Sequence, residues 1–230
     1  MKTVKIKAET KKTEKSILTK NHIYHTAISL FQKIGYEKAT MRVIASNADV
    51  ALGATYYHFR TKEDIVFHFY FLSQEEAKLQ SQSFNEHEND FSLRINNIIQ
   101  FKLNYFAKYR KFISVLAHNA GDANHPLSPF SQETKVIREE AIQIFKDAID
   151  SSNLKGKGTI LEILPELLWL YQICIIYFWI SDKSKNFEKT KKLISESMDL
   201  ILKLIKISNL PFFQMILNPI IKIYHLIKEN

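Results

Sequence analysis

Apolar residues recur at helical spacing along most of the chain, and this pattern predicts an all-α protein. From about Ser16 onward they form one helical stripe, at Ile23, Ala27, Leu30, Phe31 and Ile34. Gly35 follows this stripe at the place where a helix C-terminal cap is expected. Only five glycines and five prolines occur in 230 residues, so the sequence offers few tight turns and favours helices.

Two short helices separated by a tight turn are predicted next. Thr40 is a suitable N-cap for the first of them. Residues 48–50 form the turn, in which Asp49 can adopt a left-handed conformation. The second short helix covers about 51–58, and the TKED sequence at 61–64 then forms a capping box that opens a long helix.

The rest of the chain reads as a larger helical domain. Further helices are predicted at about 91–108, 111–119, 131–151, 159–181, 187–208 and 212–228. The stretch LLWLYQICIIYFWI (167–180) is apolar nearly all round, which indicates a buried helix. It is shorter than the roughly 20 residues that span a bilayer, so no membrane insertion is expected. The amphipathic last helix suits either a membrane surface or packing against its own domain or a partner.

Charge is distributed unevenly along the chain. The net charge is +8, and residues 1–64 hold 12 Lys/Arg against 6 Asp/Glu, which favours a polyanionic partner for this end. Residues 1–15 lack apolar periodicity and are predicted to be a flexible basic arm that either follows a DNA minor groove or serves as a solubilising tail. The single Cys174 excludes an intramolecular disulfide, and no signal-peptide pattern is present, so a cytoplasmic location is expected.

The sequence ALGATYYHFRTKED (51–64) carries the candidate chemistry. Short helices joined by a three-residue turn on a basic module are the helix-turn-helix arrangement, in which the last helix enters the major groove of DNA. Small residues allow that helix to approach closely, while hydroxyl and imidazole groups reach phosphates or base edges. The alternative is a partly buried aromatic cluster that braces the next helix. The candidate DNA contacts in this stretch are Leu52, Ala54, Thr55, Tyr56, Tyr57, His58 and Lys62.

The sequence ISLFQKIGYEKATMRVIASNADVALGATYYHFRTKEDI resembles the N-terminal domain of the tetracycline-repressor (TetR) family of bacterial regulators. The resemblance covers about residues 16–72. It implies that phosphate is bound by Thr40, His58 and Lys62, and that Arg42 reaches phosphate or a base edge. It also implies that Leu52 and Ala54 face bases, and that Tyr56 and Tyr57 contact phosphate and bases. Three positions depart from the family pattern, at Asp49, Ala51 and Thr55.

The same resemblance implies a helix-turn-helix DNA-binding domain at 16–62 and an effector-binding and dimerisation domain at 63–230. The partners would be a palindromic double-stranded operator, a small hydrophobic effector of unknown identity, and a second copy bound through the 159–181 and 187–208 helices. An aromatic-lined effector cavity has as candidates Tyr105, Phe106, Phe145, Trp169, Tyr171, Gln172 and Phe178. His118, at a helix end, either contacts this effector or braces the following loop.

The sequence shows no nucleophile–base pair, phosphate-binding loop or metal-ligand motif, so no enzymatic activity, cofactor or metal is expected. The function that results is a ligand-responsive, DNA-binding transcriptional repressor. Two alternatives remain open at this point. One is a constitutive DNA-binding regulator without an effector, and the other is a helical small-molecule-binding protein that has lost DNA binding.

Overall fold

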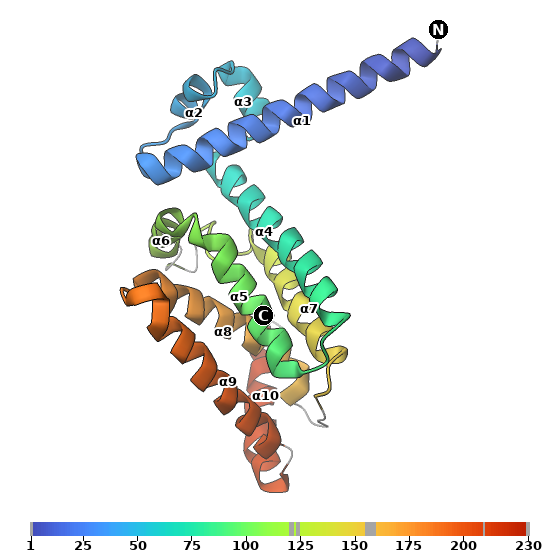
Figure 1. Ribbon diagram of the computed structural model, residues 1–230, viewed down its shortest axis with the longest axis vertical. Helices are drawn as coiled ribbons and strands as arrows, with labels where there is room; N and C mark the ends of the chain where they lie inside the picture. The colour runs from blue at the N-terminus through green and yellow to red at the C-terminus, as the bar shows by residue number, and fades with distance from the viewer. Residues whose placement is uncertain (1, 120–121, 123–124, 155–159, 209, 229–230) are drawn as a thin grey trace. The chain divides into compact units, whose positions relative to one another are not determined.

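The computed structural model describes residues 2–119, 122, 125–154, 160–208 and 210–228 (Figure 1). Within these residues the chain forms ten α-helices and one short 3₁₀ helix, with no strand. The prediction of an all-α protein is therefore confirmed. The side chains of residues 2–13, which include most of the predicted basic arm, lie outside the described part of the chain.

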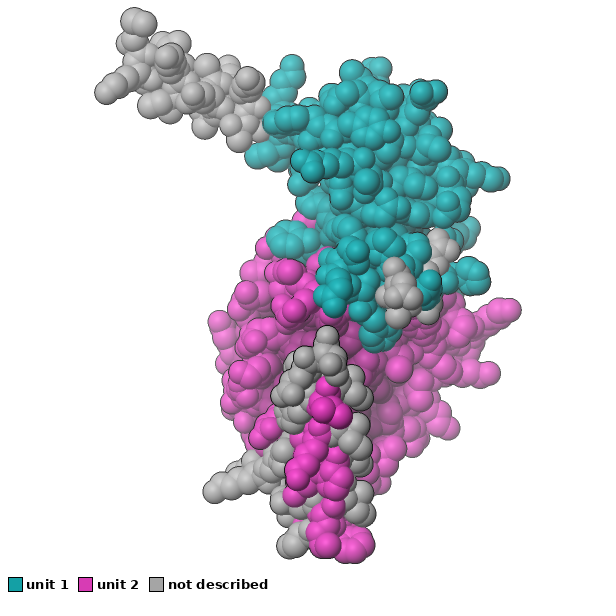
Figure 2. All heavy atoms as spheres, turned by 180° about the vertical axis from the view of Figure 1, so that it is seen from behind, with its two compact units in different colours: residues 1–71, 109–134 teal, residues 72–108, 135–230 magenta. Residues whose placement is uncertain are grey.

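The chain folds into two compact units, coloured separately in Figure 2. Unit 1 contains residues 1–71 and 109–134, and unit 2 contains residues 72–108 and 135–230. Helix α4 (Lys62–Asn85) contributes its beginning to unit 1 and its remainder to unit 2.

Unit 1 is built around a long N-terminal helix. The helices of this unit are α1 (Lys2–Lys33), α2 (Met41–Asn47), α3 (Leu52–His58), the start of α4, and α6 (Arg110–Asn119). Helix α1 begins earlier than the start near Ser16 that the apolar pattern predicted, and α2, α3 and α6 all pack against it. The rings of Phe31 and Phe112 stack at 5.3 Å between centroids, and Phe69 meets Phe112 edge-on at 5.5 Å. All three side chains are fully buried.

Unit 2 is arranged around one apolar helix. It contains α5 (Phe91–Ala107), α7 (Lys135–Asp150), α8 (Ile160–Ser181), the 3₁₀ helix η1 (Lys185–Phe187), α9 (Glu188–Ser208) and α10 (Pro211–Lys228). Helix α8 packs against α5, α7, α9 and α10, which explains why nearly all of its faces are apolar. Among the described residues, α8 is also the one helix whose length and hydropathy would allow it to cross a bilayer. Half of that apolar window is buried inside the unit, as in the core helix of a folded domain.

Two buried cations fasten the helices of unit 2. Arg94 is only 2% exposed, and its guanidinium donates hydrogen bonds to the carbonyls of Asn85, Glu88 and Ala148 and to the hydroxyl of Ser151. It therefore joins the C-terminal ends of α4 and α7, where carbonyl groups lack partners within the helix and the helix dipole favours a positive charge.

The second buried cation, Lys102 of α5, is held against α4. Its Nζ donates to the carbonyl of Ser73 at 3.0 Å and to Oε1 of Gln74 at 2.9 Å. Burial lowers the pKa of the Lys102 ammonium to about 7. Arg94 and Lys102 are therefore held by neutral oxygen atoms on neighbouring helices and segments. These hydrogen bonds fix how the helices pack against one another.

Candidate nucleic-acid interface

The turn between α2 and α3 has the geometry that the sequence predicted. Oγ1 of Thr40 accepts a hydrogen bond from the backbone N–H of Val43 at 3.3 Å and so caps α2. Asp49 has a φ of 51°, in the left-handed region, and the N–H of Val50 donates to the carbonyl of Ala45. Ala51 precedes α3 without a side-chain cap. The chain thus reverses within a few residues and directs α3 across α1 and α2, which it contacts.

Helix α3 has one buried side and one exposed side. Thr55 is fully buried, with its hydroxyl 3.4 Å from the carbonyl of Ala51, and Phe59 just after the helix is 3% exposed. On the other side Tyr57 is 81% exposed and Tyr56 is 47% exposed. A Cβ added at Gly53 would meet no atom within 4 Å, so the backbone there faces open space.

The structure therefore separates the predicted DNA contacts into three groups. Thr55 belongs to the core and offers no exposed side-chain surface. Exposed side chains are those of Thr40, Arg42, Tyr56 and Tyr57, and partly exposed ones are those of Leu52, Ala54, His58 and Lys62. The exposed group gathers on α3 and on the start of α2, which contact each other.

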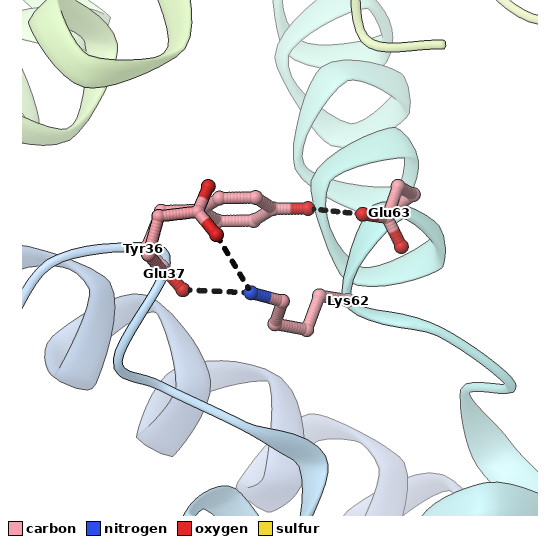
Figure 3. Close-up of polar contacts among 4 residues, drawn as sticks. All are labelled: Tyr36, Glu37, Lys62 and Glu63. Carbon is pink, nitrogen blue, oxygen red and sulfur yellow. Dashed lines mark hydrogen bonds and ion pairs between the residues drawn. The ribbon is translucent and has the colours of Figure 1, made fainter. Parts of the chain in front are cut away.

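Lys62 is engaged inside unit 1 (Figure 3). Its Nζ donates to the backbone carbonyl of Tyr36 at 3.0 Å and lies 4.2 Å from the centroid of the Tyr36 ring. The Glu37 carboxylate is 4.0 Å away, and the Lys62 side chain is only 19% exposed. This lysine ties the connection between α1 and α2 to the first turn of α4, a role that the sequence did not reveal.

The Tyr36 hydroxyl completes the same junction by donating to Oε1 of Glu63 at 2.7 Å (Figure 3). Burial and the neighbouring Glu63 raise the pKa of Tyr36 far above its ordinary value, so it remains a hydrogen-bond donor. Burial is the largest influence on the pKa of Glu63 and acts to raise it, but the hydrogen bonds from Tyr36, the backbone and Thr61, together with the charge of Lys62, outweigh it and the pKa falls. The residue after Glu63, Asp64, forms the predicted capping box with Thr61. The N–H of Asp64 donates to Oγ1 of Thr61 at 3.1 Å, and the N–H of Thr61 donates to Oδ2 of Asp64 at 3.1 Å, so this prediction is confirmed.

Three histidines lie on or beside the helix-turn-helix. The ring of His22 is 3.0 Å from the carbonyl of Ala48, so α1 holds the turn directly. His68 lies edge-on to the ring of Tyr24 at 5.2 Å, and burial together with nearby Lys20 lowers its pKa to about 4. The same two causes lower the pKa of His58. His58 is therefore mainly neutral at neutral pH and can offer DNA a hydrogen bond without a full charge.

The predicted effector contacts do not form one group. His118 is exposed and belongs to unit 1, whereas the other seven belong to unit 2. Phe106, Phe145 and Trp169 are buried, and Tyr105 is partly exposed. These positions are compatible with core packing.

Three of the effector candidates on α8 differ in their surroundings. The Tyr171 hydroxyl forms a hydrogen bond with the hydroxyl of Ser197 at 2.6 Å. Gln172 is 3% exposed, and its Nε2 has no hydrogen-bond partner within the described residues. Phe178 is 38% exposed. No group of three or more potential metal ligands occurs in the described part of the chain.

A short capped helix, a left-handed turn and an exposed, tyrosine-bearing helix define the DNA-binding class of helix-turn-helix proteins. Residues 23–69 match the family described as bacterial regulatory proteins of the tetR family. Residues 94–223, more than half of the chain, match the tetracyclin repressor-like C-terminal domain. The chain belongs to the TetR family of transcriptional regulators.

Solved structures share this fold. A putative TetR-family transcriptional regulator from Syntrophomonas wolfei is 16% identical, with a TM-score of 0.63 over 80% of this chain and 94% of that one. The fatty acid degradation regulator FadR from Bacillus halodurans is 15% identical, with a TM-score of 0.59 over 80% and 94%. A putative fatty acid metabolism regulator from Clostridium perfringens is 22% identical, with a TM-score of 0.53 over 79% and 97%. No curated protein matches the sequence.

Proposed function

We propose that this TetR-family regulator is a cytoplasmic, homodimeric repressor that leaves a palindromic operator when it binds a small hydrophobic effector. The proposed DNA-binding domain is residues 16–62, preceded by a basic arm at 1–15 and followed by an effector-binding and dimerisation domain at 63–230. Family membership supports the general role, and the surfaces described below support the particular one.

The observation that carries the DNA-binding proposal is the two-sided character of α3. Thr55 and Phe59 fix the helix to the core of unit 1, so Tyr56 and Tyr57 project from a rigid support. Their hydroxyl groups can reach phosphates and base edges, and Thr40 and Arg42 extend the same surface along α2. Lys62 acts here chiefly as a positioning residue, because its Nζ is already bound to Tyr36.

The experiment that tests this proposal is the selection of bound duplexes from a random DNA pool, followed by salt titrations of wild type and Tyr57→Ala. We expect a palindromic sequence to be enriched and to bind with steep salt dependence, since neutralised phosphates release counterions. Tyr57→Ala should weaken that binding, whereas Leu79→Ala, a truncation at an exposed leucine of α4, should leave it unchanged. Selection of no common sequence, with equal binding by both variants, would refute the proposal.

A large apolar face on α8 and α9 supports the proposed dimer. The face, which we call the α8–α9 face, consists of Leu167, Leu170, Cys174, Tyr177, Phe178, Leu193, Leu200 and Leu204. On α8 these positions recur every three or four residues apart from the adjacent Tyr177 and Phe178, and on α9 they are seven and four residues apart, so they form a stripe on each of two neighbouring helices. Exposed apolar side chains gathered on two neighbouring helices are typical of a protein–protein interface.

The dimer is tested by placing a charge on the α8–α9 face. Leu170→Lys should shift the protein from dimer to monomer in sedimentation or light-scattering measurements, because an unpaired ammonium cannot be buried cheaply. Leu79→Lys, at an exposed leucine of α4, is the matched control and should remain dimeric. A Leu170→Lys protein that stays dimeric at the same concentration would exclude this face as the interface.

Release from the operator requires that the effector bind two conformations of the dimer unequally. A ligand that favours a conformation with the wrong spacing between the two α3 helices lowers operator affinity in proportion to that preference. A shift from almost fully bound to almost fully released needs a preference of about 10⁴-fold. Operator affinity that stays constant with every ligand that binds would contradict an effector-controlled repressor.

A further inference from the structure

Unit 2 contains an apolar cavity of about 460 Å³ between α8, α9 and α10. This size lies within the range of about 300–1,000 Å³ that is usual for small-molecule sites. Its walls are formed by Ile160, Leu164, Leu167, Leu168 and Tyr171 of α8, by Ile201, Leu204, Ile205, Ile207 and Ser208 of α9, and by Phe213 and Leu217 of α10. None of these twelve side chains carries a charge.

The cavity is lined by successive turns of α8 and α9. Its lining positions on α8 extend from Ile160 to Tyr171, which corresponds to about 16 Å of helix length. The two helices run antiparallel, because a short connection joins them and Tyr171 of α8 contacts Ser197 of α9 at 2.6 Å. The Ile160 end of the cavity is therefore formed with Ser208. A linear hydrocarbon chain laid along this length of helix would contact apolar walls throughout.

Two hydroxyls meet at one end of the cavity, and one lies at the other end. The Tyr171 hydroxyl forms a hydrogen bond with that of Ser197, which also donates to the carbonyl of Leu193, and burial raises the pKa of Tyr171, so its phenol remains protonated. At the other end the hydroxyl of Ser208 already donates to the carbonyl of Ile205 at 2.7 Å. Between them the walls offer only hydrocarbon, where a charged or strongly polar group could not be buried without a large cost.

We propose that this cavity binds the hydrocarbon chain of a linear amphipathic ligand of the fatty-acid type, with the polar head group at the Tyr171–Ser197 pair. The inference rests on the proposed function only in identifying this ligand as the effector, since binding itself is measured separately. It also gives α10 a role, because Phe213 and Leu217 of this helix close one side of the cavity.

The cavity adjoins the α8–α9 face through Leu167 and Leu204, which are 41% and 54% exposed. In the proposed dimer, the second copy would cover this exposed rim and shield the ligand from water. The competing occupant is the second copy itself, inserting its own side chains into the groove. Chain-length dependence distinguishes the two, because only a hydrocarbon ligand tightens as methylenes are added.

The test is calorimetric titration of the full-length protein with octanoate, decanoate, laurate and palmitate, each below its micellar concentration. We expect saturable binding that tightens roughly tenfold for every two methylenes added, until the chain exceeds the cavity. Leu204→Trp should fill the space and weaken laurate binding at least tenfold. The matched control is Leu79→Trp, at an exposed leucine of α4 that belongs neither to the cavity walls nor to the α8–α9 face, and it should bind as wild type does.

Tyr171→Phe tests the head-group end separately. It should weaken binding several-fold while leaving the gain per added methylene unchanged. Absence of saturable binding, or laurate binding that Leu204→Trp does not affect, would overturn the inference.

Operator binding measured in the same samples separates this inference from the proposed function. A protein that binds its operator but no fatty acid would retain the DNA-binding proposal and lose the hydrocarbon site. Laurate that binds in the wild type, is blocked in Leu204→Trp and leaves operator affinity unchanged would confirm the site. That last result would remove effector release by this ligand from the proposed mechanism.

Discussion

Replacement of Lys62 by alanine should reduce the stability of the fold more than the capacity of the surface to bind DNA. Its position at the start of a helix predicted that this lysine binds phosphate. In the structure its Nζ instead contacts both the carbonyl and the ring of Tyr36. These contacts join residues 26 positions apart in the sequence. The Lys62→Ala change would free the α1–α2 connection from the first turn of α4.

The size of the effect follows from the separate contacts. A hydrogen bond from a charged donor contributes about 1.5–3 kcal/mol. A partly exposed cation–π contact adds about 0.5–1 kcal/mol. The ion pair with Glu37 adds about 0–1 kcal/mol, because its 4.0 Å separation and the 80% exposure of Glu37 leave it screened by water. Allowing for residual hydration of the ammonium, we expect a loss of about 2 kcal/mol, or a fall in Tm of roughly 4–8 °C.

The assay is urea and thermal unfolding followed by circular dichroism, together with operator binding at a temperature where all variants are folded. Tyr57→Ala is the control, because a side chain that is 81% exposed should change stability by less than about 0.5 kcal/mol. The two variants should then separate the two properties. Lys62→Ala should lose stability with a nearly unchanged salt slope, and Tyr57→Ala should lose affinity at unchanged stability.

The opposite pattern would refute this reasoning. A Lys62→Ala protein as stable as wild type, with a salt slope reduced by about 1, would identify Lys62 as a phosphate ligand. The contact with Tyr36 would then be dispensable for folding.

Three further predictions concern stability. Arg94→Met should lower the free energy of unfolding in urea by about 3–5 kcal/mol, because it leaves the carbonyls at two helix ends without their buried donor. A loss below about 1 kcal/mol would contradict the role given to Arg94. Ala51→Ser should add the missing cap of α3 and stabilise the protein by about 1 kcal/mol, visible as a higher Tm, and an unchanged or lower Tm would show that the cap does not form.

The third prediction concerns pH. The pKa of His68 is about 4 in the folded protein, against its ordinary value of 6.5 in the unfolded chain. Between these two values unfolding takes up a proton, so stability is lost as pH falls from about 6.5 towards 4. After allowance for partial solvent screening, the loss at pH 5 relative to pH 7 should be about 1 kcal/mol. His68→Leu should flatten that dependence, and an equally steep curve in His68→Leu would assign it to other groups.

The parts of the structure that the sequence predicted depend on near neighbours. The Thr40 cap, the left-handed Asp49 and the Thr61–Asp64 box each involve residues within a few positions, and all three were confirmed. The contacts of Lys62 with Tyr36 and of His22 with Ala48 join residues 26 apart, so no local pattern announces them.

The buried cations of α5 were missed for a different reason. Lys102 lies on the same helical stripe as Phe91, Ile95 and Ile98, which are core residues, and that position was a signal that could have been noticed. Periodicity shows that such a side chain points inward but does not show which oxygen atoms will receive it. The acceptors of Lys102, Ser73 and Gln74, lie on another helix and became apparent only in the folded structure.

Lys62 and Lys102 both hold helix α4 in place. It is the described helix that contributes substantially to both units, with the division falling between residues 71 and 72. Lys62 fixes its first turn within unit 1, and Lys102 fixes Ser73 and Gln74 within unit 2. The same helix is therefore held by one lysine contact within each unit. If an effector bound in unit 2 alters the Lys102 contact, the change therefore acts on the helix that also carries Lys62 at its start.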